Sequence, residues 1–222
     1  MVIVAAGQGS RFGGDIPKQY LLLGGHPVLL HALRPFTSHP DVVSVIVVLP
    51  ANDVTAPPSW LEPLLGDTLR VVAGGASRRD SVAAGLAMLP EGCEVVLVHD
   101  GARPFAPRDV IDAGIAAARG GHGAVPALPV ADTLKRADDC GRVLCTVPRE
   151  GLWQAQTPQA FPRALLERGH AADAGLERQA TDDAMLVELV GGRVDLIPGS
   201  SRNIKITTPD DLALAAFLMV TA

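Results

Sequence analysis

The sequence predicts an α/β fold in which helices cover both faces of a mostly parallel sheet, and two observations lead to this prediction. Short apolar runs rich in Val recur along the first half of the chain, at residues 2–6, 42–49, 69–73 and 94–99. Continuous runs of this length are typical of strands buried on both faces, as in parallel sheets. Helix-like stretches alternate with them, at residues 27–36, 77–89 and 107–121. Because strands that alternate with helices form parallel sheets, any ligand is expected beyond the carboxyl ends of these strands.

The second half of the chain predicts a β-hairpin that departs from this pattern. After a strand expected at 123–130, residues 133–149 alternate polar and apolar side chains on both sides of a polar Asp-Asp-Cys-Gly-Arg turn. Because so polar a hairpin has little core of its own, we expect residues 132–150 to project as an arm and to pack against a second subunit. The remaining expected elements are helices near 162–172 and 182–190, strands near 194–197 and at 203–207, and a helix at 208–220 that Thr208 caps. We expect residues 1–222 to form a single domain.

The composition argues against several classes of protein. The net charge of −5 disfavours non-specific nucleic-acid binding, so any anionic ligand must meet positive charge that is gathered locally. The longest apolar runs fall well short of the ~20 residues that a membrane span needs, and we expect neither a signal peptide nor a transit peptide. The three cysteines include no Cys-x-x-Cys pair. This favours a reduced cytoplasmic setting, or the plastid stroma in a eukaryote.

The loop after the first strand is rich in glycine and carries two basic residues, Arg11 and Lys18. Its spacing does not fit the dinucleotide fingerprint, because the gap after Gly7 and Gly9 is one residue too long and Pro17 interrupts the region where the helix should begin. It does not fit the P-loop either, because Lys18 follows a proline and precedes Gln19. Glycines still let backbone N–H groups approach an anion. From these residues alone, an anion-binding loop and a flexible loop with two solvated charges remain the alternatives.

This segment resembles the start of the 2-C-methyl-D-erythritol 4-phosphate cytidylyltransferases, with AAGxGxRxG followed by PKQYL. Six further blocks similar to those of this family follow in order: GGASRRDSVAAGL (74–86), VLVHDGARP (96–104), ADTLKR (131–136), REGLWQAQTPQAF (149–161), TDDA (181–184) and NIKITTPDDL (203–212). The resemblance implies a Rossmann-like nucleotidyltransferase fold with a twisted sheet. It also implies transfer of CMP from CTP to 2-C-methyl-D-erythritol 4-phosphate, with release of pyrophosphate, in isoprenoid precursor biosynthesis.

By this resemblance, Arg11 and Lys18 are the catalytic residues. The nucleophile is already an anionic phosphate oxygen, so the reaction needs positioning and charge stabilisation rather than an activated side chain. The implied nucleotide-binding residues are Ala5, Ala6, Gly7, Gly9, Gly74, Gly75, Ser81, Asp100, Gly101 and Arg103. The residues implied to position the acceptor are Thr133, Arg149, Thr157, Thr181, Asp182, Lys205 and Thr207. Arg149 would reach the site of the neighbouring subunit in a homodimer.

A divalent cation, Mg²⁺, is the implied cofactor. Asp100 is its candidate protein ligand, although the phosphates of CTP would hold most of the ion's coordination sphere. The requirement for local positive charge is met within the family blocks, which contain Arg11, Lys18, Arg78, Arg103, Arg149 and Lys205.

Two other functions remain open at this point. A cytidylyltransferase acting on ribitol 5-phosphate would share the nucleotide loop and differ in the acceptor pocket. A non-catalytic CTP-binding regulator would bind the nucleotide without releasing pyrophosphate. Purely structural roles are also open, because Ser77, Asp80 and Asp182 are suited to capping helices and Asp100 to capping a loop.

Overall fold

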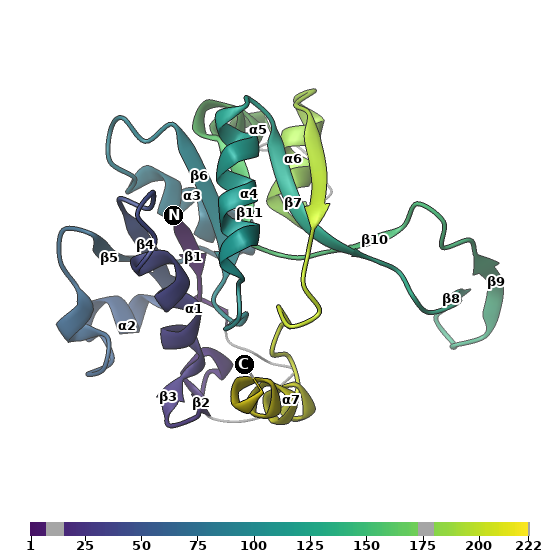
Figure 1. Ribbon diagram of the computed structural model, residues 1–222, viewed down its shortest axis with the longest axis horizontal. Helices are drawn as coiled ribbons and strands as arrows, with labels where there is room; N and C mark the ends of the chain where they lie inside the picture. Colours follow the sequence, from purple (N-terminus) through teal and green to yellow (C-terminus); the bar gives the residue numbers. More distant parts are fainter. Residues whose placement is uncertain (8–15, 173–179, 222) are drawn as a thin grey trace.

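The computed structural model describes residues 1–7, 16–172 and 180–221. At its centre lies an eight-stranded sheet in the order β10-β7-β11-β6-β1-β4-β5, with β12 also paired to β7 (Figure 1). Its strands are β1 (Val2–Val4), β4 (Val45–Leu49), β5 (Leu69–Ala73), β6 (Val95–Asp100), β7 (Gly123–Pro129), β10 (Trp153–Ala155), β11 (Gln159–Pro162) and β12 (Val194–Pro198). Strands β5, β4, β1 and β6 pair in parallel, as do β7 and β12. The predicted mostly parallel α/β sheet is thus confirmed.

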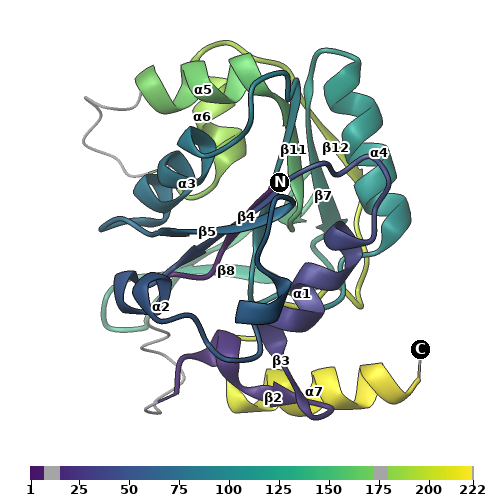
Figure 2. The ribbon, with the colours of Figure 1, turned by 90° about the vertical axis from the view of Figure 1, so that its left-hand side faces the viewer.

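Helices cover both faces of this sheet, as predicted (Figure 2). One face carries α1 (Val28–Thr37) and α4 (Arg108–Arg119), and the other carries α3 (Arg78–Ala87), α5 (Arg163–Ala172) and α6 (Asp183–Leu189). In β4, Val45, Val47 and Leu49 join the first core, whereas Ile46 and Val48 join the second. Because side chains alternate along a strand, a continuous apolar strand needs a helical layer on each face. Across the described ranges, every helix is too short or too polar to traverse a lipid bilayer.

Two features of the sheet differ from the prediction. The strand expected at 203–207 is wrong, because this segment pairs with no strand and its backbone instead bonds a loop, with the Ile206 N–H donating to the Ala102 carbonyl at 2.9 Å. Strands β10 and β11 were not predicted, and β11 lies antiparallel between β6 and β7. The sequence of β11, Gln-Ala-Phe-Pro, has only four residues, holds no β-branched residue and ends in proline, so its strand signal is weak.

The predicted hairpin is confirmed. Strands β8 (Leu134–Ala137) and β9 (Val143–Val147) pair antiparallel and project from the body of the protein (Figure 1). In the turn, the Asp138 carboxylate accepts from the N–H groups of Cys140 and Arg142 at 3.0 and 2.9 Å, and Gly141 has a φ of 79°. A positive φ there suits glycine. The dimerisation role of residues 132–150 and the single domain over residues 1–222 stay predictions.

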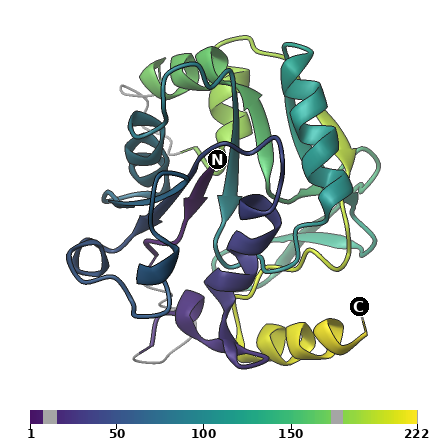
Figure 3. The same ribbon diagram turned by 60° about the vertical axis from the view of Figure 1, so that its left-hand side comes forward.

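The carboxyl ends of the parallel strands face the end of the molecule where α7 (Pro209–Val220) lies (Figure 3). A small core joins α7 to the strand pair β2 (Leu22–Leu23) and β3 (His26–Pro27), through Leu23, Val28 and Ala215. Thr208 caps α7 by accepting from the Asp211 N–H, so the predicted cap is confirmed. The short elements are η1 (Lys18–Tyr20), α2 (Ala51–Thr55) and η2 (Glu62–Leu64).

His99, near the end of β6, is fully buried and joins the loops at this end of the sheet. Its Nδ1 accepts from the Thr157 hydroxyl at 3.0 Å, and its Nε2 donates to the Arg103 carbonyl at 2.9 Å. The Thr157 hydroxyl also accepts from the Asp100 N–H at 3.1 Å, and the Asn203 side chain donates to the Thr157 carbonyl at 2.8 Å. Three segments far apart in the sequence are therefore held together around one ring.

Burial of His99 makes the stability of the fold depend on pH. Burial lowers the pKa of His99 to about 4, so below pH 6.5 the unfolded chain binds a proton that the folded chain does not. The free energy of unfolding should therefore fall as the pH drops from about 6.5 to 4. Between pH 7 and pH 5, we expect this residue to account for a loss of about 2 kcal/mol in urea unfolding experiments.

The variant His99→Gln is the control, because glutamine retains a donor and an acceptor but does not titrate. Its free energy of unfolding should change less between pH 7 and pH 5 than that of the unmodified protein. Equal slopes in the two proteins would contradict the assignment to His99.

Candidate active site

A cavity of about 660 Å³ opens at the carboxyl ends of the parallel strands. It lies between the loop after β1, the 3-10 turn η1, the start of α3 and the loop after β6. The structure brings together here the predicted residues Ala5, Ala6, Gly7, Lys18, Gly75, Ser81, Asp100, Gly101 and Lys205. Ligand sites of open α/β sheets lie at this position.

A second cavity, of about 250 Å³, adjoins the first. Its predicted residues are Arg103, Thr157, Thr181 and Asp182. Arg78, Asp100 and Lys205 line both cavities and so form a shared wall. Two ligands bound on either side of this wall would meet beside it, as a group transfer between them requires.

The carboxylate of Asp100 is the centre of the shared wall. Lys205 Nζ lies 2.8 Å from one of its oxygens, and Arg103 Nε lies 3.7 Å from the same oxygen. Arg78 Nε lies 3.5 Å from the other oxygen. Burial alone would raise the pKa of Asp100, but the charges of these three cations hold that pKa well below its usual value. Asp100 is therefore a carboxylate throughout the physiological pH range.

Glycines let the loop before α3 pack closely against the loop after β1 and against the first turn of α3. A Cβ atom on Gly74 would clash with the Cβ of Ala6, and one on Gly75 would clash with the Cβ of Asp80. Ser77 and Asp80 form a reciprocal capping box at the start of α3, so both of the suggested capping residues act together. The Ser81 hydroxyl accepts from the Gly75 N–H at 3.2 Å and fixes the turn. Contact of Gly74, Gly75 and Ser81 with a nucleobase stays a prediction.

The turn η1, which carries Lys18, is fixed by its two neighbours. Gln19 is buried, and its Nε2 donates to the Ala5 carbonyl at 2.7 Å. The Tyr20 hydroxyl donates to Asp53 at 2.6 Å, and burial together with this hydrogen bond raises the pKa of Tyr20. Lys18 therefore stands on a turn that is bonded to the loop after β1 and to α2, on the wall of the larger cavity.

Two buried glutamines, which sequence analysis did not single out, shape the smaller cavity. Gln156 donates to the Ser200 carbonyl at 2.9 Å and accepts from the Ser200 N–H at 3.1 Å. Gln159 donates to Asp182 at 2.8 Å and accepts from the Ala184 N–H at 3.1 Å. Both lie in the block 149–161, and the run Gln-Thr-Pro-Gln was the available signal. Asp182 itself caps α6 by accepting from the Met185 N–H.

Some predicted residues do not lie at these cavities within a single chain. Thr133 and Arg149 are exposed on the projecting arm, where Arg149 donates to the carbonyl of Ala131. Thr207 lines neither cavity, and its hydroxyl donates to Asp211 at 2.7 Å, next to the cap of α7. Gly9 and Arg11 lie outside the described residues.

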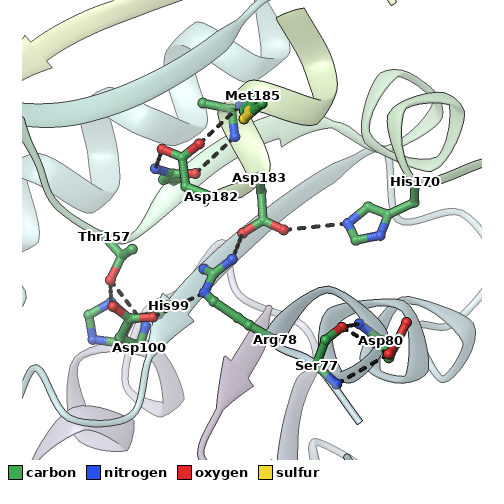
Figure 4. Close-up of polar contacts among 12 residues, drawn as sticks. Ser77, Arg78, Asp80, His99, Asp100, Thr157, His170, Asp182, Asp183 and Met185 are labelled. Atoms are coloured by element: carbon green, nitrogen blue, oxygen red, sulfur yellow. Dashed lines mark hydrogen bonds and ion pairs between the residues drawn. The ribbon is translucent and has the colours of Figure 1, made fainter. Parts of the chain in front are cut away.

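Arg78 lies at the site, although the sequence assigned it no individual role. It lies at the start of α3, where its guanidinium reaches Asp183 at 2.7 Å and Asp100 at 3.5 Å (Figure 4). The sequence had placed Arg78 in a family block as local positive charge, but neither of its partners is close in sequence.

Comparisons with known proteins identify relatives of this chain. A family model described as IspD: 2-C-methyl-D-erythritol 4-phosphate cytidylyltransferase matches residues 1–221. A protein of Dechloromonas aromatica that carries this enzyme name is 47% identical, over 98% of this chain and 96% of the relative. The solved structure of the enzyme from Thermus thermophilus is 36% identical and superposes with a TM-score of 0.82, covering 99% of this chain and 98% of that one.

Other relatives are longer. The bifunctional enzyme IspD/IspF of Rhodospirillum rubrum is 47% identical over 96% of this chain, but the match covers only 55% of that protein. The chain thus spans about half the length of such bifunctional relatives. Because both the family match and the relatives of similar length extend over nearly every residue, the chain belongs to the 2-C-methyl-D-erythritol 4-phosphate cytidylyltransferase family.

Proposed function

We propose that this protein transfers CMP from CTP to 2-C-methyl-D-erythritol 4-phosphate. In this reaction an oxygen of the acceptor phosphate bonds to the α-phosphorus of CTP. The bond from that phosphorus to the oxygen bridging the β-phosphate breaks, and pyrophosphate leaves. The observation that carries the proposal is the pair of adjoining cavities that share Arg78, Asp100 and Lys205. CTP would occupy the larger cavity and the acceptor the smaller one.

The residues of the shared wall suit a reaction between two anions. Lys205 and Arg78 present positive charge toward both cavities, where it offsets the repulsion between the two phosphates. Lys18, on the wall of the larger cavity, would contribute to the same stabilisation on the nucleotide side. A nucleophile that is already anionic needs no general base. Positioning and electrostatic stabilisation are therefore the contributions that we propose for these side chains.

Magnesium dependence is part of the proposal, and the donor set fits a metal held mainly by the substrate. Among the described residues, no group of three or more His, Cys, Asp or Glu side chains gathers to bind an ion. The lowered pKa of Asp100 leaves one carboxylate at the shared wall to act as a ligand. Mg²⁺ is commonly held by one or two carboxylates together with substrate phosphates. When bound, the ion would neutralise charge on the triphosphate.

A homodimer is also part of the proposal, and the surface of the arm supports it. Val143, Leu144 and Trp153 are exposed on or beside the hairpin, where a second copy could cover them. Arg149 and Thr133 lie on the same arm, remote from their own cavities, so they would complete the acceptor site of the neighbouring subunit. We propose a cytoplasmic location as well, which the three free cysteines support.

The first experiment measures pyrophosphate release from CTP and Mg²⁺, with 2-C-methyl-D-erythritol 4-phosphate and ribitol 5-phosphate as separate acceptors. We expect release with the first acceptor, and at least about 100-fold less with the second, because a site built for one polyol phosphate leaves polar groups unpaired with another. Addition of excess EDTA should abolish release without unfolding the protein. Release with ribitol 5-phosphate alone would contradict the proposed identity of the acceptor. CTP binding without any release of pyrophosphate would indicate a regulator.

The shared site predicts complementation between two variants that are each impaired when assayed at an acceptor concentration below the KM of Arg149→Ala. Lys18→Ala should lower kcat far more than CTP affinity, and Arg149→Ala should mainly raise the KM for the acceptor. After the two proteins are unfolded and refolded together, a mixed dimer would hold one site with both Lys18 and Arg149. Activity should then recover to about a quarter of that of the unmodified dimer. A mixture no more active than the average of its two components would contradict the role of the arm.

A further inference from the structure

Asp183 is a fully buried carboxylate that the proposed reaction does not yet use. It is the first residue of α6 and lines neither cavity. Capping does not explain its presence, because Asp182 already accepts from the Met185 N–H and Gln159 accepts from the Ala184 N–H. A buried carboxylate is costly unless a partner compensates its charge.

The partner is Arg78, which extends from α3 and stands between two carboxylates (Figure 4). Its Nη1 donates to Asp183 Oδ2 at 2.7 Å, while its Nε lies 3.5 Å from Asp100 Oδ1. Burial alone would lower the pKa of Arg78, but the charges of Asp183 and Asp100 raise it above its usual value. The shorter and better-formed contact is the one to Asp183, on the side away from the cavities.

The other oxygen of Asp183 points toward a buried histidine. Asp183 Oδ1 lies 3.4 Å from His170 Nε2, and within the described part of the chain neither atom has a hydrogen-bond partner. His170 belongs to α5 and is itself almost completely buried. Asp183 thus stands between α3 and α5, with Arg78 on one oxygen and a ring on the other. Neighbours on both sides restrict the directions in which the carboxylate can turn.

A small displacement of the Arg78 side chain would change the lining of both cavities. Its side chain lines both cavities, and 30% of its surface is exposed to them and to solvent. A long side chain in such a place samples several rotamers unless something anchors it. Asp100 is a shared anchor, since Lys205 and Arg103 also surround it, whereas the described residues show Asp183 paired with a single arginine.

We propose that Asp183 is a positioning residue, which holds the Arg78 guanidinium in the wall shared by the nucleotide and acceptor cavities. The inference rests on the proposed function for its kinetic consequence, because the phosphates of the two substrates are what Arg78 would face. Asp183 touches neither substrate. It acts through Arg78, and replacing it lets the guanidinium leave the wall.

The test is a double-mutant cycle with Asp183→Asn and Arg78→Gln. We expect Asp183→Asn to lower kcat/KM by about 10- to 100-fold, as displacements of about 1 Å can do. If Asp183 acts through Arg78, the double variant should be no more than about twofold slower than Arg78→Gln alone. Losses that multiply, or a single variant that keeps full activity, would overturn the proposal.

Asp112→Asn is the matched control. Asp112 also lies between a buried histidine and an arginine, with His39 at 2.9 Å and Arg108 at 3.8 Å, but it lines neither cavity. This variant should retain activity within about twofold, because Asp112 is half-exposed and neither it nor its partners line either cavity. Should Asp183→Asn fail to fold, the pair Arg78→Met with Asp183→Leu leaves no uncompensated buried charge. That double variant should fold and remain slow, and near-normal activity would overturn the proposal.

A second readout does not depend on catalysis. The side-chain ¹⁵N signals of the Arg78 Nη atoms, identified by their loss in Arg78→Gln, report rotation about its Nε–Cζ bond. They should be resolved in the unmodified protein and merge in Asp183→Asn, while unchanged signals would overturn the positioning role. If the unmodified protein released no pyrophosphate, the proposed function would fail, and the signals would still decide whether Asp183 restrains Arg78.

Discussion

One carboxylate with three cations around it organises the functional end of this protein. Asp100 lies at the end of β6, and its partners come from α3, from the loop after β6 and from the segment before α7. Without Asp100, the charges of Arg78, Arg103 and Lys205 would repel one another in a half-buried space. With it, three separate segments converge on one point. The hydrogen bonds of His99, Thr157 and Asn203 hold two of these segments, the loop after β6 and the segment before α7.

This arrangement explains how an acidic chain can gather positive charge at one place, as the proposed polyanionic substrates require. The net charge of −5 is spread over the whole sequence, whereas the shared wall gathers its basic residues beside a few carboxylates. Carboxylates of this kind orient the cations before any ligand arrives. Less side-chain freedom is then lost on binding, and this favours both affinity and correct placement.

The sequence predicted the parts of the fold whose signals are local. Valine-rich runs indicated the parallel strands, and Ser77, Asp182 and Thr208 indicated helix starts that the structure confirms. Strand β11 escaped prediction because its pairing with β6 and β7 decides its conformation, not its own four residues. The segment 203–207 was misread because its bonds go to loops.

The site shows the same division between local and long-range signals. The family blocks identified most of the residues lining the two cavities, and the position of these cavities follows from the sheet. The contact between Arg78 and Asp183 could not be predicted, because the two residues are far apart in sequence and Arg79 stands beside Arg78 as an equally plausible partner. Contacts of this kind exist only once the helices on one face of the sheet have packed together.

The distance in sequence between Asp100 and Lys205 has a consequence for biosynthesis. A ribosome makes Asp100 well before it makes Lys205. The strands β1, β4, β5 and β6 all precede Lys205 in the chain and are neighbours in the sheet, so they can pair before this lysine is made. Arg78 and Arg103 are then already present beside Asp100, and Lys205 joins them once residues 203–207 have bonded to the loop after β6. The charge cluster around Asp100 is therefore completed later in synthesis than the strands that carry this carboxylate.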